Sequence, residues 1–207
     1  MGRGFKSHPA RLNMTIEALL WDFGGVIVRD NLKPAFQELN IPYNEQVRNA
    51  WKKHRLGQLN QEEFYKKALK DTEYINLLPN LRTKADELIE LQPNGALPIV
   101  RRIFHMEKYK QGVISNHSKE WGKYIINKWN LKEILNPIIV SADIGLDKSS
   151  SLIFYYTLKL IKTKPENTIF IDNDPNNVNL ANSIGINAIL FHNAKQLREE
   201  LRAYDIF

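Results

Sequence analysis

Four groups of polar residues that could do chemistry each follow a short apolar run of the chain. They are Asp22, Ser115 with Asn116, Lys148, and Asp172 with Asn173 and Asp174. Carboxylate and amide oxygens can bind a cation, whereas a hydroxyl and an ammonium group can hold a phosphate. Any one of these residues alone is more often a turn or helix-capping residue than a catalyst. Their recurrence after successive apolar runs therefore indicates a shared site.

The elements that must position these residues are short, β-rich and mostly apolar throughout. They span residues 16–21, 112–115, 137–141, 168–171 and 187–191. Continuous apolar runs are typical of strands that are covered on both faces, and helical patterns separate the last four runs. We therefore expect a three-layer, Rossmann-like α/β fold with a parallel sheet. The carboxyl ends of its strands would meet at one edge, where such sheets bind ligands.

The long segment between the first two runs carries helical patterns and no clear strand. In "LNQEEFYKKAL", Asn60 is a predicted helix cap and Glu63 completes a capping box. One crossover helix needs far fewer residues than this segment holds. We therefore expect residues 31–95 to form an inserted helical cap, and residues 14–30 and 96–207 to form the core domain. Residues 1–13 are polar and basic, and we expect them to be a flexible extension or a remnant of cloning.

The composition of the 207-residue chain restricts its possible functions. There is no cysteine, which excludes disulfides, thiolate metal sites and a cysteine nucleophile. No apolar run approaches the ~20 residues needed to cross a bilayer, so we expect a soluble protein without a membrane partner, and the lack of cysteine fits a cytoplasmic location. The net charge of +6 is spread along the chain and mixed with acidic residues. We therefore expect no nucleic-acid partner, although the charge would attract anionic substrates. The sequence indicates no oligomeric state.

The motifs, in their order, resemble the haloacid dehalogenase-like hydrolase superfamily over residues 14–195. The four matching stretches are "LLWDFGGVIV", "GVISN", "GLDKSSSLIFYYTLK" and "TIFIDNDPNNVNLANSIGINAILF". The segment "LGQLNQEEF" (56–64) is similar to the small helical cap of sugar-phosphate phosphatases and of the phosphatase domain of soluble epoxide hydrolases. The resemblance implies the strand order 5-4-1-2-3, in which the first and fourth strands are neighbours.

The resemblance also implies a mechanism and a set of ligands. Asp22 would be the nucleophile and form an aspartyl-phosphate, and Lys148 would stabilise the charge that develops. A Mg²⁺ ion would bind the carboxylates of Asp22 and Asp172 and the carbonyl of Gly24. The phosphoryl group of a small phosphorylated substrate would be held by Ser115, Asn116 and Lys148. Support for the metal ligands would come from Asn173, Asp174 and Asn177.

Gly24 departs from the family pattern, because typical phosphatases of the family carry a second Asp there that protonates the leaving group. Such acid–base assistance contributes about 10²–10⁴-fold to the rate. Three functions remain open: a Mg²⁺-dependent phosphatase of a metabolite such as a sugar phosphate, a non-catalytic module that binds a phospholigand or a protein, and a dehalogenase-type hydrolase. The phosphatase is favoured because some sugar-phosphate phosphatase-like members also have glycine there. His117 could supply the proton, or it could be a loop histidine at the mouth of the site.

Overall fold

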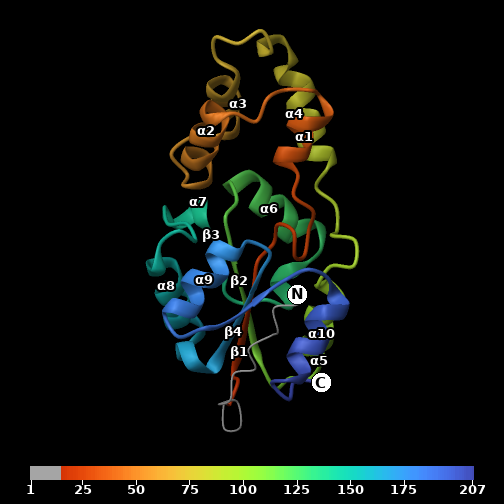
Figure 1. Ribbon diagram of the computed structural model, residues 1–207, viewed down its shortest axis with the longest axis vertical. Helices are drawn as coiled ribbons and strands as arrows, with labels where there is room; N and C mark the ends of the chain where they lie inside the picture. The colour runs from red at the N-terminus through yellow and green to blue at the C-terminus, as the bar shows by residue number, and fades with distance from the viewer. Residues whose placement is uncertain (1–14) are drawn as a thin grey trace, which may run out of the picture.

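The computed structural model describes residues 15–207, so the extension expected at residues 1–13 lies outside the described residues. One parallel sheet organises the chain (Figure 1). Its strands are β1 (Ala18–Trp21), β2 (Lys110–Ser115), β3 (Ile138–Val140), β4 (Thr168–Asp172) and β5 (Asn187–Leu190). The order across the sheet is β3-β2-β1-β4-β5. This confirms the predicted order and the α/β fold.

Helices cover both faces of the sheet. On one face, Leu20 of β1 and Phe170 of β4 pack with Phe154 of α8 (Ser151–Ile161) and Ala181 of α9 (Pro175–Ser183). The other face packs against α5 (Leu97–His105), α6 (Lys119–Lys128) and α10 (Ala194–Arg202). Every residue of β1 is fully buried. That burial explains why the strand sequence is apolar without alternation.

Four helices connect β1 to α5, and they lie beyond the carboxyl ends of the strands (Figure 1). They are α1 (Leu32–Glu38), α2 (Glu45–Arg55), α3 (Gln61–Leu69) and α4 (Leu78–Glu87), with a short 3₁₀ turn, η1 (Ile75–Leu77), before α4. We refer to α1–α4 as the helical cap. Its apolar side chains, among them Phe36, Val47, Phe64 and Leu81, are buried together. The remaining short elements are α7 (Ser141–Ile144), η2 (Leu131–Glu133) and η3 (Pro165–Asn167).

Local capping signals mark the beginnings of several helices. Asn60 accepts a hydrogen bond from the backbone N–H of Glu63, whose side chain in turn accepts one from the Asn60 N–H. This reciprocal pair is the predicted capping box of α3. Ser118 caps α6 by accepting from the N–H of Trp121. Caps of this kind satisfy backbone donors that have no partner within the helix, so they hold each helix start in place.

The register of the sheet gathers the polar strand ends at one edge. Trp21 pairs with Val113 on one side and with Ile171 on the other, so Asp22, which follows it, lies between the ends of β2 and β4. All five strands are parallel, and their carboxyl ends therefore point the same way. Within residues 15–207, none of the helices has the length and apolar character that a membrane span requires.

Candidate active site

Asp22 is held at the end of β1 by hydrogen bonds from two neighbouring elements. Its backbone N–H donates to the carbonyl of Ile171 at 2.9 Å, which extends the pairing of β1 with β4. The hydroxyl of Ser115 and the N–H of Phe23 both donate to its Oδ1, at 3.0 and 2.7 Å. Only 7% of Asp22 is exposed. A carboxylate is therefore fixed at the centre of the ligand edge of the sheet.

Lys148 lies between the two buried carboxylates. Its Nζ is 2.7 Å from Oδ2 of Asp22 and 2.6 Å from Oδ2 of Asp172, and the residue is 1% exposed. The backbone N–H of Lys148 donates to Oδ1 of Asn116 at 2.9 Å. Asn116 therefore positions the loop that carries the lysine. One buried cation offsets the repulsion between two carboxylates that arrive on different strands.

Asp172, the last residue of β4, is oriented by the start of α9. The N–H of Asp174 donates to its Oδ1 at 2.7 Å, and Nδ2 of Asn177 donates to its Oδ2 at 3.0 Å. Asp174 also caps α9 by accepting from the N–H of Asn176. The proposed supporting residues Asp174 and Asn177 thus contact Asp172 directly, from the helix that follows its strand.

Burial and charge set the protonation of the central groups. Burial raises the pKa of Asp22 to about 7, while the charge of Lys148 acts to lower it and that of Asp172 to raise it. Burial acts to lower the pKa of Lys148, but the carboxylates of Asp172 and Asp22 outweigh it and raise the pKa. The cluster therefore stabilises a protonated Lys148 at neutral pH.

Two adjacent glycines, Gly24 and Gly25, lie just after Asp22, and the two positions differ in why glycine is found there. Gly25 has a φ of +74°, and a Cβ there would lie 2.1 Å from Nδ2 of Asn173. Gly25 is therefore needed both for its left-handed backbone and for the space that Asn173 occupies. Gly24 is not among the residues with positive φ. The amide of Asn173 lies against the turn of Gly25, and no hydrogen bond joins it to Asp172 within the described part of the chain.

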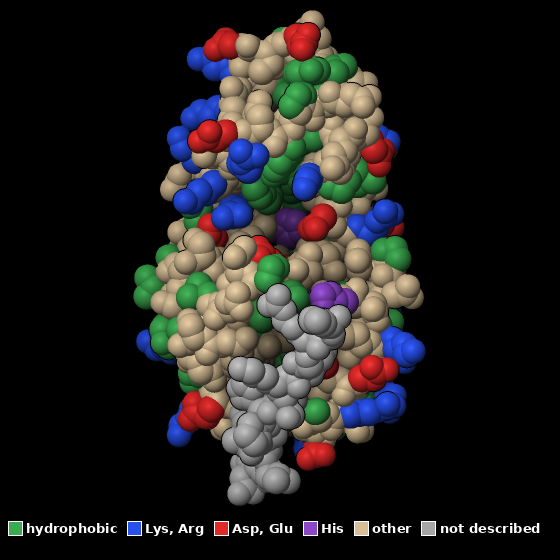
Figure 2. Space-filling view, viewed as in Figure 1, with side chains coloured by type: hydrophobic (Ala, Val, Ile, Leu, Met, Phe, Trp, Pro, Cys, Tyr) green, Lys and Arg blue, Asp and Glu red, His purple; other side chains and the backbone are tan. Residues whose placement is uncertain are grey.

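A cavity of about 400 Å³ opens between the sheet edge and the helical cap. Figure 2 shows the hollow between the upper helices and the lower core, with basic and acidic side chains at its rim. The core contributes the predicted site residues Asp22, Gly24, Ser115, Asn116, Lys148, Asp172, Asn173, Asp174 and Asn177. The structure therefore brings the whole predicted set to one cavity.

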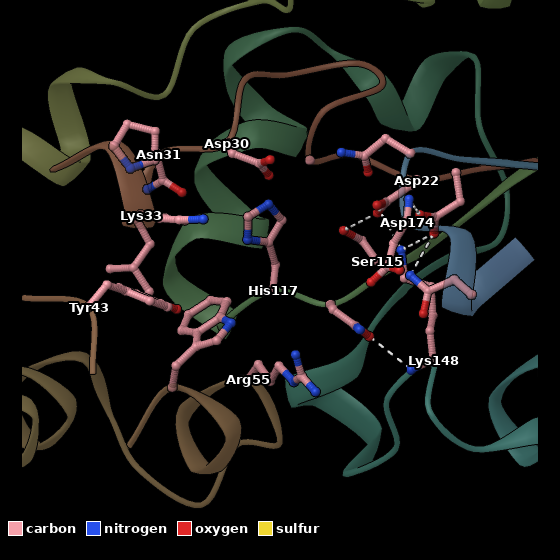
Figure 3. Close-up of a pocket in the computed structure, with 18 of the residues that line it drawn as sticks. Asp22, Asp30, Asn31, Lys33, Tyr43, Arg55, Ser115, His117, Lys148 and Asp174 are labelled. Atoms are coloured by element: carbon pink, nitrogen blue, oxygen red, sulfur yellow. Dashed lines mark hydrogen bonds and ion pairs between the residues drawn. The ribbon is translucent and has the colours of Figure 1, made fainter. Parts of the chain in front are cut away.

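The cap side of the cavity carries residues that the sequence did not indicate. They are Asp30, Asn31, Lys33, Tyr43, Trp51 and Arg55, several of which Figure 3 shows facing the strand ends. Asp30 and Asn31 precede α1, and Arg55 ends α2. No spacing or periodicity marks them, because their meeting with the core depends on how the helices sit over the sheet.

His117 is buried in the wall of this cavity. It is 7% exposed, and neither ring nitrogen has a hydrogen-bond partner among the described residues. Burial lowers its pKa to about 4, and the nearby charges of Lys148 and His54 act in the same direction. The ring is therefore neutral at neutral pH, which makes it a poor general acid.

The oxygen donors of the site fit a magnesium ion. Two carboxylates, Asp22 and Asp172, converge on one ammonium group, and Gly24 lines the same cavity. Across residues 15–207, no group of three or more His, Cys, Asp or Glu side chains could hold a metal. Zinc sites usually need three or four such ligands, whereas Mg²⁺ is typically held by one or two carboxylates with water and substrate phosphate. The residues present therefore fit Mg²⁺.

Solved structures share this fold at low sequence identity. A HAD family enzyme from Bacteroides thetaiotaomicron superposes with a TM-score of 0.74 at 18% identity, over 91% of this chain and 99% of that one. A structure of that enzyme in complex with magnesium and inorganic phosphate superposes with a TM-score of 0.70 at 19% identity, over 86% of this chain and 95% of that one. A 2-haloacid dehalogenase from Pseudomonas syringae superposes with a TM-score of 0.60 at 17% identity, over 92% of this chain and 100% of that one.

A curated relative is drimenol cyclase drtB from Aspergillus calidoustus, which is 24% identical over 202 residues. The match covers 90% of this chain and 36% of the relative, so the chain spans about a third of that protein's length. The family model described as haloacid dehalogenase-like hydrolase matches residues 19–191, which include every residue of the site. Because this match spans most of the sequence, the chain belongs to the haloacid dehalogenase-like hydrolase family.

Proposed function

We propose that this hydrolase is a Mg²⁺-dependent phosphomonoesterase that acts on a small phosphorylated metabolite, such as a sugar phosphate. The observation that carries the proposal is the position of Asp22. Its buried carboxylate lies within hydrogen-bond distance of both the Ser115 hydroxyl and the Lys148 ammonium. A carboxylate with a hydroxyl and a cation beside it is suited to attack a phosphorus atom whose oxygens those groups hold.

The main obstacle to this reaction is the repulsion between a carboxylate and a phosphate ester. A unit charge pair 4 Å apart costs about 4 kcal/mol at an effective dielectric constant of 20. Lys148 supplies one positive charge at the point where Asp22 and Asp172 converge. A Mg²⁺ ion bound by Asp22, Gly24 and Asp172 would supply two more and neutralise the phosphoryl oxygens.

The residues of the chain divide the reaction between them. Asp22 attacks the phosphorus, the ester oxygen leaves, and water later hydrolyses the aspartyl-phosphate. Lys148 and Ser115 bind the phosphoryl oxygens and stabilise the charge that builds up on them. Asn116 holds the backbone of Lys148 in place. The side chains of Asp22, Ser115 and Lys148 already lie within hydrogen-bond distance of one another before the substrate arrives.

The helical cap supplies the leaving-group side of the cavity. The residues there are mostly polar, with an amide at Asn31, a phenol at Tyr43 and cations at Lys33 and Arg55. A polar lining favours a hydroxylated leaving group over an apolar one, because it offers hydrogen-bond partners that only a hydroxylated group can use. This supports a sugar phosphate or a related metabolite as the substrate class.

The test is turnover of purified full-length protein on nitrophenyl phosphate and on a panel of sugar phosphates, with Mg²⁺ or with a chelator. We expect turnover only with Mg²⁺, and a loss of at least about 10³-fold in Asp22→Asn. The matched control is Asp71→Asn in the cap, because the Asp71 side chain is 85% exposed and its only ion pair within residues 15–207 is with Lys70, at 3.8 Å. Its backbone is left-handed, a conformation that asparagine also tolerates.

Other outcomes distinguish the two remaining functions. Absence of turnover together with Mg²⁺-dependent binding of inorganic phosphate would support a non-catalytic phospholigand-binding module. Chloride release from 2-chloropropionate without Mg²⁺ would support a dehalogenase-type hydrolase. The phosphatase proposal fails if the wild-type protein and Asp22→Asn hydrolyse the phosphate panel equally.

A further inference from the structure

The carboxyl group of Asp30 occupies the space into which a side chain at position 24 would project. A Cβ built on Gly24 would lie 2.9 Å from Oδ1 of Asp30, closer than real Cβ contacts allow. The next nearest atom is Nε2 of His117, at 3.9 Å. Because the backbone of Gly24 is not left-handed, its φ does not require glycine. What glycine provides here is room for the Asp30 carboxylate beside the turn that follows Asp22.

Asp30 is also the acidic side chain of the cavity that has no other partner. Asp22 and Asp172 both contact Lys148, and Asp174 caps α9. For Asp30, no hydrogen bond or ion pair is found within residues 15–207. Figure 3 shows its carboxylate directed toward the side of the cavity where Asp22 and Ser115 lie. Asp30 is an exposed residue that also lines the cavity, so it lies where substrate and water would enter.

We propose that Asp30 is the general acid and base of the hydrolysis that Asp22 begins. This inference rests on the proposed phosphatase function. An alkoxide is a poor leaving group, so departure of a sugar needs a proton in the transition state. Among the described residues that line the cavity, Asp30 has the one carboxyl group that neither pairs with a cation nor caps a helix. This carboxyl group lies beside the turn that follows Asp22. Its place just before α1 also puts it on the leaving-group side.

The proton balance of the two steps is simple. In the first step, Asp22 forms a bond to phosphorus, the bond from phosphorus to the ester oxygen breaks, and the Asp30 carboxylic acid gives its proton to that oxygen. In the second step, the Asp30 carboxylate takes a proton from water as that water attacks phosphorus, and the bond from phosphorus to Asp22 breaks. The products are the alcohol and inorganic phosphate, and Asp30 ends protonated as it began.

The deciding experiment compares Asp30→Asn with wild type on two kinds of substrate. With a sugar or alkyl phosphate, we expect kcat/KM to fall by about 10²–10⁴-fold, because the alkoxide leaves unprotonated. With nitrophenyl phosphate, the nitrophenolate leaves without a proton. The first step should then survive and give a burst of about one nitrophenol per protein, followed by slow turnover. The acid-quenched variant should carry one phosphate, detected as added mass on the intact protein.

Three further variants make the outcome interpretable. Asp71→Asn should behave as wild type on both substrates, and all variants should keep the wild-type thermal unfolding midpoint. Asp30→Glu should retain at least tenfold more activity on the alkyl phosphate than Asp30→Asn, because it keeps the carboxyl group. A purely structural role for Asp30 would not produce a substrate-dependent loss with a burst. His117→Gln tests the other nearby group.

The proposal is overturned if Asp30→Asn hydrolyses the alkyl phosphate within twofold of wild type, or if the substrate-dependent loss belongs to His117→Gln and not to Asp30→Asn. In both of those outcomes the wild-type enzyme still hydrolyses phosphate esters, so the proposed function stands. If the wild type hydrolyses no phosphate ester, the proposed function and this inference fail together.

Discussion

The guanidinium of Arg55 donates two hydrogen bonds to Oδ2 of Asp147, from Nε at 3.1 Å and from Nη2 at 2.8 Å. Arg55 is the last residue of α2 in the helical cap, whereas Asp147 immediately precedes Lys148 in the core. Close by, the hydroxyl of Ser141 donates to the carbonyl of Arg55. The end of one cap helix is therefore fastened to the loop that carries the catalytic lysine candidate.

Replacing Arg55 with Ala should weaken this attachment. The Arg55 side chain is 24% exposed and that of Asp147 is 4% exposed, so we expect the free energy of unfolding to fall by about 1–2 kcal/mol. The control, Arg48→Ala on the same helix, removes an exposed hydrogen bond to the backbone of Tyr43. It should change the free energy of unfolding by less than about 0.5 kcal/mol. Urea denaturation of both variants measures the difference. Equal stabilities of the two would show that the pair contributes nothing.

Replacing Lys148 with Met should destabilise the metal-free protein severely. The change leaves Asp22 and Asp172 buried beside each other without their shared cation, which costs about 3–5 kcal/mol when one partner of a buried pair is removed. Mg²⁺ should then raise the unfolding midpoint of this variant more than that of wild type, because the ion replaces the missing charge. Thermal unfolding with and without Mg²⁺ measures both effects. Lys33→Met, which changes an exposed lysine of the same cavity, is the control, and similar curves for the two variants would contradict the prediction.

His117 should make the protein less stable in acid. Burial, with the charges of Lys148 and His54, lowers its pKa from 6.5 to about 4 in the folded state. At pH 7 the ring is neutral in both states and contributes nothing. As the pH falls from 6.5 to about 4, the unfolded chain binds a proton that the folded chain does not, so stability is lost; below about 4 the loss levels off. The expected loss is about 3 kcal/mol. The His117→Gln variant should lack this loss of stability when unfolding free energies are compared between pH 7 and pH 4. Parallel curves of unfolding free energy against pH for the variant and the wild type would contradict the prediction.

The two glycines after Asp22 should respond differently to alanine. Gly25→Ala forces a left-handed residue against Asn173, and we expect it to cost about 1–2 kcal/mol of stability. Gly24→Ala meets no backbone strain, so stability should change by less than about 0.5 kcal/mol. Its new methyl group would instead displace the Asp30 carboxyl group and lower turnover of alkyl phosphates. Denaturation curves and phosphatase kinetics of the two variants test this contrast. Equal losses of stability in both variants would refute the prediction.

Much of the fold could be predicted because its signals are local. The residues of β1 are buried on both faces, so the run around Leu20 is apolar throughout and reads as a central strand. The cap of α3 is encoded by Asn60 and Glu63, three residues apart. The predicted strand limits differ from the observed ones by one or two residues at several ends. Ile16, for example, precedes β1, and Lys110 begins β2, since strand ends depend on pairing partners.

Much of the candidate site could also be predicted, because a parallel sheet brings every strand's carboxyl end to one edge. Ser115 and Asp172 each end a strand and Asp22 directly follows one, so their convergence follows from the strand order alone. Lys148 follows the same logic from the loop after β3. Their roles stay predictions, whereas their proximity is a property of the fold.

The sequence by itself determined the apolar strands, the polar residues that follow them and the absence of an acidic side chain at Gly24, whereas the strand order was implied by the family resemblance. Only the tertiary structure decided what fills that space. The carboxyl group of Asp30 fills the space beside Gly24, and Arg55 contacts Asp147, 92 positions away in the chain. Both contacts form because the cap helices pack against the strand ends. Such contacts depend on how the side chains of the helical cap pack against those of the core. They do not depend on periodicity along the chain, so no local sequence pattern predicts them.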